Sequence, residues 1–388
     1  MKSRSVAWWR VRIVRDFLFQ AVLLGAVVLI ISGMVWNASS ALERQHIASG
    51  FGFLNNTAGF DIVQSLVRFD ETSTYARVLL VGFLNTLVVA ISGIFLATVF
   101  GLVIGIGQLS SNWLVAKLCR AYVETLRNIP LLLQLFFWYF AVLRTLPIPR
   151  ESWSVLGGLY LNNRGLYVPQ PEALPGFSFV LLALAVGLVG AWVCALMAQR
   201  RREATGDVCP IGLQIFGLIV VPVLIASAAL NFPLRFSWPV LDGFNFEGGV
   251  VLLPELMALV LALSTYTASY IAEIVRAGIQ GVAKGQIESS QALGLHRGQI
   301  LRLVLVPQAM RQIIPPLTSQ YLNLTKNSSL AVAIAYPDLV SVFAGTTLNQ
   351  TGQAIEIIGI TMGVYLTLSL LTSSAMNWYN SRIALTER

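Results

Sequence analysis

Charged side chains recur at helical spacing in one polar stretch, residues 269–308, which lies between long apolar segments. This polar stretch contains Glu273, Arg276, Lys284, Glu288, His296, Arg297 and Arg302. Such a segment is too polar to cross a bilayer, and its helical period is too regular for a simple tether. We therefore expect it to contact something outside the membrane.

Polar residues inside apolar segments form a second candidate site. Lys326 is the costliest of them in lipid, and its ammonium could pair with the carboxylate of a substrate. It lies roughly 28 Å along an unbroken helix from Pro307, so snorkelling to the headgroups explains it equally well. The other members could face a substrate path or a neighbouring helix. The whole set is Asn128, Gln134, Asn323, Lys326, Asn327 and Ser328.

Signatures of catalysis and of metal binding are missing from the sequence. There is no phosphate-binding loop, no H-E-x-x-H and no nucleophile elbow. The two histidines, His46 and His296, are expected on opposite faces of the membrane, which disfavours a histidine metal site. We expect a chain that is no enzyme and binds neither a metal nor a cofactor itself.

The composition indicates an all-α polytopic membrane protein. Of 388 residues, 56% are hydrophobic and 11% are charged, whereas soluble proteins carry about 25% charged residues. Several apolar runs reach the roughly 18 residues that span hydrocarbon. About eight transmembrane helices are predicted, at residues 17–36, 78–108, 122–143, 179–198, 211–230, 250–272, 308–335 and 354–378.

Prolines and turn residues predict where the spans are kinked or interrupted and where long loops connect them. Pro130 can kink the third span, and Pro315 with Pro316 is expected to interrupt the seventh. Residues 144–177 are rich in Pro, Gly and Tyr, and an aromatic segment follows residue 230. We expect both of these to be loops.

The distribution of basic residues predicts the topology. With eight spans, the loops on the side of the N-terminus hold 18 Lys and Arg residues and the opposite loops hold seven. The excess places both termini and the polar stretch in the cytoplasm. The basic pI of 9.6 follows from this bias, so no nucleic-acid partner is required.

Small residues form one stripe on the second span, at Gly93, Ala97, Gly101 and Gly105. Small side chains let helices approach closely in lipid, where no hydrophobic force drives them together. Tight helix packing is therefore favoured over a pore-lining role.

A break divides the polar stretch into two short helices. Residues 287–293 can form the first, and Gly294 is the natural residue to end it in a left-handed cap. A second helix restarts near His296 and leads into Pro307. An ordinary interfacial amphipathic helix would not need this break, so a compact knob for a soluble partner is favoured.

The spacing within this knob resembles the EAA signature of permease subunits of ABC importers. Glu288-Ser289-Ser290, Gly294, Val304, Val306 and Pro307 stand at the signature positions, with two serines in place of alanines. The flanking runs SYIAEIVRAGIQGVAKGQ, ETLRNIPLLLQLFFWYF and LVPQAMRQIIPPL look like the polar amino-acid branch of that superfamily. Length and insert position resemble the long-form permease of general L-amino-acid (glutamate, glutamine, aspartate, asparagine) uptake systems.

The resemblance implies a type I ABC importer permease fold. Its five-helix core would comprise residues 78–108, 122–143, 250–272, 308–335 and 354–378. Residues 1–77 would form a cytoplasmic tail, an extra helix and a periplasmic loop. Residues 78–388 would form the permease domain, with an inserted helix pair at 144–249.

The resemblance also implies a mechanism and a set of partners. A periplasmic binding protein would deliver a small amino acid, and a second, non-identical permease subunit would complete the path through the lipid of the bacterial inner membrane. Two ATPase subunits, which hold ATP and Mg, would drive the transport through the cytoplasmic knob. Its coupling residues would be Glu288, Ser289, Ala292, Leu293, Gly294, Leu295 and Pro307.

The alternative is a self-sufficient channel or secondary transporter with a cytoplasmic regulatory docking loop. Carboxylates inside the spans, able to bind a coupling ion, would favour this alternative. The chain has almost none, because Glu255 and Glu356 lie close to span ends.

Overall fold

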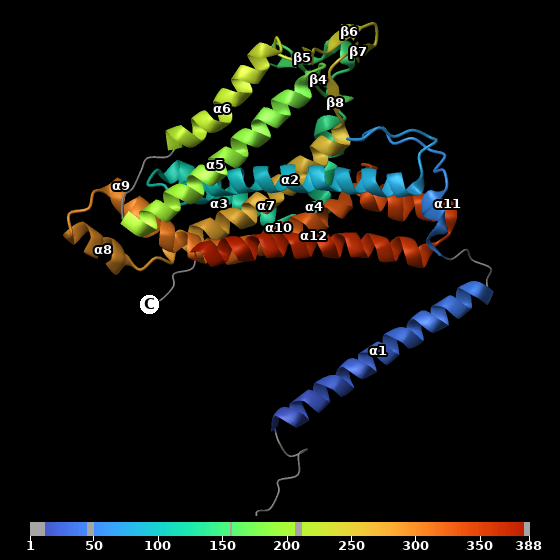
Figure 1. The fold of residues 1–388 in the computed structure, drawn as a ribbon, viewed down its shortest axis with the longest axis horizontal. Coiled ribbons are helices and arrows are strands. Elements are labelled where there is room, and N and C mark those ends of the chain that lie inside the picture. The colour runs from blue at the N-terminus through green and yellow to red at the C-terminus, as the bar shows by residue number, and fades with distance from the viewer. Residues whose placement is uncertain (1–11, 45–49, 156, 206–211, 384–388) are drawn as a thin grey trace, which may run out of the picture. The chain divides into compact units, whose positions relative to one another are not determined.

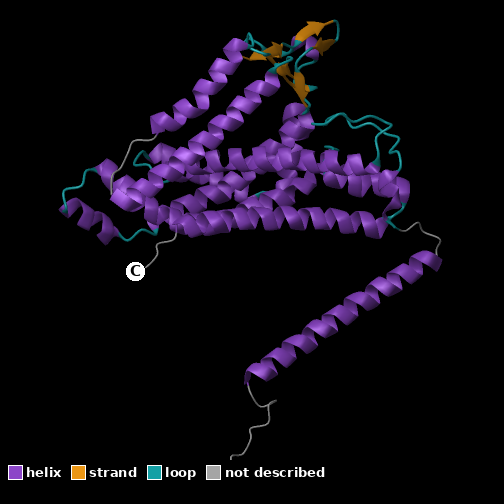
Figure 2. Ribbon diagram, viewed as in Figure 1, coloured by secondary structure: helices purple, strands orange, loops and turns teal. Residues whose placement is uncertain are grey.

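The computed structural model describes residues 12–44, 50–155, 157–205 and 212–383. It is mostly helical (Figures 1 and 2). Contacts divide the chain into two compact units, residues 1–132 with 263–388, and residues 133–262. The predicted domain boundaries at residue 77 and at residues 144 and 249 stay predictions.

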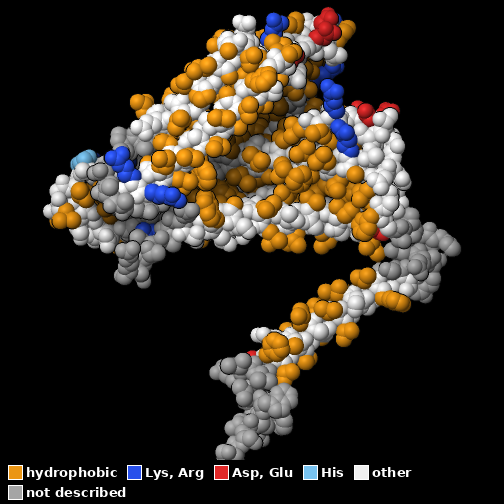
Figure 3. All heavy atoms as spheres, in the orientation of Figure 1, with side chains coloured by type: hydrophobic (Ala, Val, Ile, Leu, Met, Phe, Trp, Pro, Cys, Tyr) orange, Lys and Arg blue, Asp and Glu red, His pale blue; other side chains and the backbone are white. Residues whose placement is uncertain are grey.

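The first helix, α1 (Arg12–Arg44), is apolar over residues 16–37, none of which is buried by the rest of the chain. Figure 3 shows hydrophobic side chains along its length. An apolar helix without a protein cover needs hydrocarbon around it. The predicted first span is therefore present as a long helix.

Six helices of the described residues are long and apolar enough to cross a membrane. These are the segments Asp16–Asn37, Tyr75–Gly107, Phe177–Ala198, Gly212–Ala229, Pro254–Gln280 and Ala354–Ser381. The number rises to seven if the broken pair Trp113–Asn128 and Leu131–Leu143 counts as one span. The predicted polytopic helical fold is confirmed. The seventh predicted span, residues 308–335, is helical but is not among these apolar helices.

In the larger unit, α2 (Tyr75–Gly107) packs against its neighbours through the stripe of small residues. A Cβ atom added at Gly101 would lie 2.5 Å from Cγ2 of Ile271, and one at Gly105 would lie 2.8 Å from the carbonyl oxygen of Ala272. Both contacted residues belong to α7 (Pro254–Gln280). The packing role predicted for the stripe is confirmed, and we call this contact the helix seam.

The predicted third span is two helices rather than one, which corrects its expected start at residue 122. α3 (Trp113–Asn128) is capped at its N-terminus by Asn112, whose side chain accepts hydrogen bonds from the amides of Leu114 and Val115. It ends before Ile129 and Pro130, and α4 (Leu131–Phe136) follows. Proline disfavours helical backbone at the residue before it and lacks the N–H that would continue the ladder.

The two prolines of the seventh predicted span do not interrupt it, and that expectation is wrong. α10 (Val306–Asn327) runs through Pro315 and Pro316 as one helix and continues as the 3-10 helix η6 (Ser328–Ile334). Each proline removes one backbone donor, but packing against α2 and α12 (Ala354–Ile383) holds the helix together. The π-helix η7 (Val340–Thr347) and α11 (Leu348–Thr351) connect η6 to α12.

A buried core closes the end of the larger unit where α2 begins. It includes Phe53 from the 3-10 helix η2 (Phe51–Asn55), Tyr75 from α2, and Phe343 from η7. Deeper along α2, the side-chain amide of the buried Asn85 donates to the carbonyl oxygens of Gln64 and Pro337, each at 2.8 Å. These bonds fasten two connecting segments to α2.

The smaller unit contains short strands where only loops were expected. Antiparallel pairing links β1 to β2, β2 to β3 and β3 to β8, and the pairs β4–β5 and β6–β7 form two further ribbons. The ring of Phe246 stacks on Tyr160 and Tyr167 across these strands. The strands are β1 (Trp153–Val155), β2 (Leu159–Asn162), β3 (Gly165–Val168), β4 (Gln170–Ala173), β5 (Leu234–Ser237), β6 (Val240–Asp242), β7 (Asn245–Glu247) and β8 (Val250–Leu252).

The helices of the inserted region, α5 (Phe177–Thr205) and α6 (Gly212–Ala229), pack on each other within the same unit (Figure 1). A Cβ atom at Gly187 would lie 2.6 Å from the carbonyl oxygen of Leu218. Close backbone approach at a small residue thus recurs in this helix pair.

Candidate functional site

The first half of the knob folds as α8 (Lys284–Ala292), and Gly294 lies in the turn that follows its C-terminal end. Gly294 has φ +76°, in the left-handed region. Its N–H donates to the carbonyl of Gln291, and the N–H of Leu295 donates to that of Ser290. This pair of bonds is the Schellman motif, which satisfies the last carbonyls of a helix. The predicted break at Gly294 is confirmed.

Most side chains of α8 and its cap remain outside the packed core. Leu293 is 81% exposed, although it is a large apolar residue. The side chains of Glu288, Ser289 and Ala292 are exposed as well, while Ser290 is buried and its hydroxyl donates to the carbonyl of Gln286. These exposed side chains are therefore available to a partner.

The second half of the knob begins at His296, whose backbone N–H donates to the side chain of Gln299 at 3.2 Å. The short helix α9 (Arg297–Gln299) leads into the π-helix η5 (Ile300–Leu305), and Pro307 stands in the first turn of α10. α8 packs against η5. We call residues 284–305 the coupling knob. It projects from the end of α10 and α12 in Figure 1.

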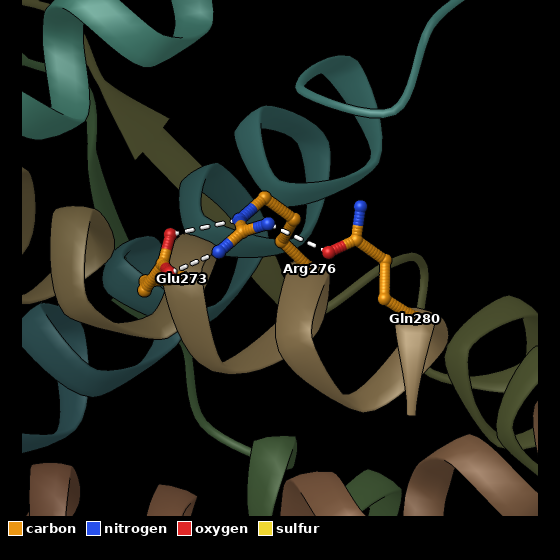
Figure 4. A network of polar contacts seen from close by, with 3 residues as sticks. All are labelled: Glu273, Arg276 and Gln280. Carbon is orange, nitrogen blue, oxygen red and sulfur yellow. Dashed lines mark hydrogen bonds and ion pairs between the residues drawn. The ribbon is translucent and has the colours of Figure 1, made fainter. Parts of the chain in front are cut away.

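The part of the polar stretch within α7 is tied together along one helix face (Figure 4). Arg276 donates to both carboxylate oxygens of Glu273, at 3.0 Å from Nε and 2.5 Å from Nη2. Its Nη1 also donates to Gln280 at 2.6 Å. This bidentate pair is a strong, directional ion pair. It is held in place before any partner arrives.

Beside this ion pair lies a cavity of about 710 Å³ between α2, α3 and α7, which we call the polar cavity. The guanidinium carbon of Arg127 lies 5.0 Å from the ring centroid of Tyr270, within cation–π range. Arg127 and Glu124, three residues apart on α3, both line the cavity. Its lining residues are Gln108, Arg120, Val123, Glu124, Arg127, Asn128, Tyr270, Glu273 and Arg276.

Lys326 lies at a second cavity, of about 680 Å³, lined by residues of α10, η6, η7 and α12. We call it the lysine cavity. Tyr365 also lines it, and the hydroxyl of Tyr365 donates at 3.4 Å to Asp338, which is buried. The remaining lining residues are Ser329, Val332, Val340, Thr361, Met362, Leu366 and Ser369. A single ammonium in a mostly apolar recess is suited to a small anionic group.

The structure distributes the predicted substrate-path residues over several places. Asn128 belongs to the polar cavity and Lys326 to the lysine cavity. Asn323 is exposed, and the buried Ser328 donates to the carbonyl of Thr325 at 2.7 Å. Their role in transport stays a prediction. Gln134 is 5% exposed and lies in the smaller unit, and Asn327 is half-buried at the end of α10.

Several residues of the polar cavity were absent from the predicted sites. Tyr270, Glu273 and Arg276 recur three residues apart, so their spacing alone placed them on one face of a helix. Gln108 gave no such signal, because a single glutamine at the end of an apolar span has many explanations. As for metals, no group of three or more His, Cys, Asp or Glu residues comes together in the described ranges.

Comparison with known proteins identifies relatives along nearly the whole chain. The family described as Binding-protein-dependent transport system inner membrane component matches residues 93–385. The General L-amino acid transport system permease protein AapQ of Rhizobium johnstonii is 56% identical over 365 residues, covering 93% of this chain and 91% of the relative.

Two further relatives have similar coverage. The Putative amino-acid ABC transporter permease protein YhdX of Escherichia coli is 51% identical over 375 residues, with 97% of this chain and 95% of the relative covered. The Glutamate/glutamine/aspartate/asparagine transport system permease protein BztB of Rhodobacter capsulatus is 39% identical over 412 residues, with 97% and 96% covered.

Proposed function

Because the chain belongs to the family of binding-protein-dependent transport system inner membrane components, we propose that it is the permease subunit of an ATP-driven amino-acid importer. The observation that carries the mechanism is the coupling knob, an exposed helix ended by a left-handed glycine. The relatives named above are permeases of amino-acid transport systems. These comparisons support a permease and give no support to a self-sufficient channel or secondary transporter.

The coupling knob would fit a groove on an ATPase subunit. Leu293 and Ala292 would enter the groove, Glu288 and Ser289 would make polar contacts at its rim, and Gly294 would set the turn. Leu295 and Pro307 would hold the knob on α10. Closure of two ATPase subunits, each holding ATP and Mg, would then pull on this lever and switch the spans between inward-open and outward-open states.

The remaining partners follow from the same proposal. A periplasmic binding protein would deliver the amino acid, and a second, non-identical permease subunit would complete the translocation path. The excess of basic residues supports a topology in which both termini and the coupling knob would lie in the cytoplasm, with the apolar helices in the lipid of the bacterial inner membrane.

The lysine cavity is our candidate for a substrate contact within the membrane. The ammonium of Lys326 would face the carboxylate of the passing amino acid, and Ser329 would offer a hydroxyl beside it. The cavity of about 680 Å³ is large enough for a small amino acid. Snorkelling of Lys326 to the headgroups is the competing explanation.

Purification of the tagged chain with its partners tests the proposed function. We expect an ATPase subunit to co-purify, and ATP hydrolysis in proteoliposomes to rise when the binding protein and its amino acid are added together. The chain reconstituted alone should transport nothing. Amino-acid uptake by the chain alone, without an ATPase, would contradict the proposal.

A further inference from the structure

The polar cavity is separate from the coupling knob and from the lysine cavity, with which it shares no lining residue. Glu273 and Arg276 neutralise each other through their bidentate pair, so they offer a ligand little net charge. The groups that remain are the guanidinium groups of Arg120 and Arg127, the carboxylate of Glu124 and the amide of Asn128.

This combination of charged groups disfavours a ligand whose charges are all of one sign. A purely anionic ligand would find two arginines but would also meet the carboxylate of Glu124. A purely cationic ligand would find Glu124 but would be repelled by both guanidinium groups. A small molecule that carries a carboxylate and an ammonium close together can satisfy both signs at once.

The lining also indicates which part of such a molecule is recognised. Val123 and Tyr270 are the apolar or aromatic members, and the ring of Tyr270 is used by Arg127. The lining thus offers no apolar recess for a large side chain, while the volume of about 710 Å³ leaves room for side chains of different sizes. Recognition would therefore rest on the charged groups common to all amino acids.

We propose that the polar cavity is an amino-acid site open to the cytoplasm, which binds the zwitterionic backbone of a free amino acid. This inference rests on the proposed function, which supplies both the substrate class and the cytoplasmic side. Arg127, positioned by the ring of Tyr270, holds the carboxylate together with Arg120, and Glu124 with Asn128 holds the ammonium. Gln108, only 3% exposed, has a side-chain nitrogen without a hydrogen-bond partner among the described residues, so the cavity wall holds an unused donor.

Occupancy of this site has a consequence for transport. A ligand shifts a conformational equilibrium toward the state that binds it better. An amino acid that binds from the cytoplasm favours the state in which this cavity exists, and it slows each return to the outward-open state. Uptake is then expected to fall as the internal amino-acid concentration rises.

Equilibrium binding to the purified importer in phosphatidylcholine nanodiscs, without its binding protein, tests the site. The probe is radiolabelled L-glutamine, competed by unlabelled N-acetyl-L-glutamine, which lacks the ammonium, and by L-glutamine methyl ester, which lacks the carboxylate. We expect L-glutamine to bind and both analogues to compete at least about tenfold more weakly, because each loses one charge-assisted contact. This series needs no variant and so does not depend on the folding of a mutant.

Two variants assign the contacts. Arg127→Gln is expected to weaken L-glutamine binding about tenfold or more, and Glu124→Gln is expected to abolish the preference for L-glutamine over N-acetyl-L-glutamine. Arg200→Gln is the matched control, since Arg200 is an exposed arginine at the end of α5 and belongs to neither cavity. Its binding should equal that of the unmodified chain.

Three results would overturn the inference. The first is the absence of L-glutamine binding in these nanodiscs, the second is equal competition by both analogues, and the third is displacement of L-glutamine when phosphatidylglycerol replaces phosphatidylcholine. The last result would assign the arginines to an anionic headgroup. Uptake through the binding protein is measured in parallel, to separate the proposed importer function from the proposed cytoplasmic site. If uptake is normal and any of these three results is found, the cytoplasmic site is refuted and the importer function is not.

Discussion

The helix seam and the coupling knob both depend on glycine, for opposite physical reasons. At the seam, Gly101 has ordinary helical backbone, but an added Cβ would collide with Ile271. At the knob, Gly294 has open space around it, and its φ of +76° is the constraint. The seam needs the absence of a side chain so that helices can touch, whereas the knob needs the backbone freedom that the absence permits.

This difference means that the seam should affect the stability of the folded chain, whereas the knob should affect its coupling to a partner. The seam lies among buried residues, so its disruption should lower the stability of the whole larger unit. The knob is exposed, so its disruption should leave that unit folded and alter only what binds to it. Substitutions at the two glycines test whether stability and coupling are separate properties of this chain.

The largest effect is expected from Gly101→Leu. The new side chain must displace Ile271 and approach the carbonyl of Ala268, and overpacking of this kind costs about 3 kcal/mol. The apparent Tm of the detergent-purified chain should fall by several degrees, or the folded chain should be lost. Gly363→Leu is the control, because nothing lies within 4 Å of a Cβ at Gly363. Equal Tm values for the two variants would refute the seam as a stabilising contact.

A smaller effect on free energy, with a severe effect on transport, is expected from Gly294→Leu. A leucine held in the left-handed region costs about 2 kcal/mol. Because the knob is exposed, its backbone can relax to another conformation, and the turn at residue 294 is then lost. Uptake and ATPase binding should be lost, while membrane insertion and Tm stay as in the unmodified chain. Gly285→Leu on the same helix, with free space and no positive φ, should retain uptake. Coupled ATP hydrolysis at the normal rate in Gly294→Leu would contradict the role of the knob.

Leu293→Ser probes the surface of the knob rather than its backbone. Loss of a leucine that a partner buries weakens binding by about 1.5 kcal/mol, or roughly tenfold. The affinity for the ATPase subunit should drop without any change in Tm. Val63→Ser, another strongly exposed apolar residue but outside the knob, should leave that affinity unchanged. An unaltered affinity in Leu293→Ser would remove Leu293 from the interface.

The smallest effect is expected from Gly294→Asn. Asparagine tolerates the left-handed region better than other side chains, so the cost should stay below about 1 kcal/mol. Uptake should remain within about fivefold of the unmodified chain. If uptake in Gly294→Asn is as low as in Gly294→Leu, crowding by the partner rather than backbone conformation is the reason for the glycine.

Local patterns in the sequence were sufficient for most of the long helices, for the stripe of small residues at the seam and for the break in the knob. The stripe from Gly93 to Gly105 has a four-residue period that maps onto one helix face, and Gly294 follows a short helical run. The short strands were not predicted, because each spans only three or four residues. Two of their pairings, β3–β8 and β4–β5, also join segments far apart in the chain. Pro315 and Pro316 were misjudged because tertiary packing can preserve a helix that has lost backbone donors.

Hydropathy and glycine spacing are local properties, so they were enough to predict a polytopic helical membrane protein with a knob ended by Gly294. The set of polar residues that share a cavity depends instead on tertiary packing. Arg127 from α3 and Tyr270 with Glu273 from α7 are separated by more than a hundred residues of sequence, and nothing in their spacing brings them together. The packing of α3 on α7 does so, and the hydroxyl of Tyr122 in α3 donates to the carbonyl of Thr265 in α7 at 2.7 Å.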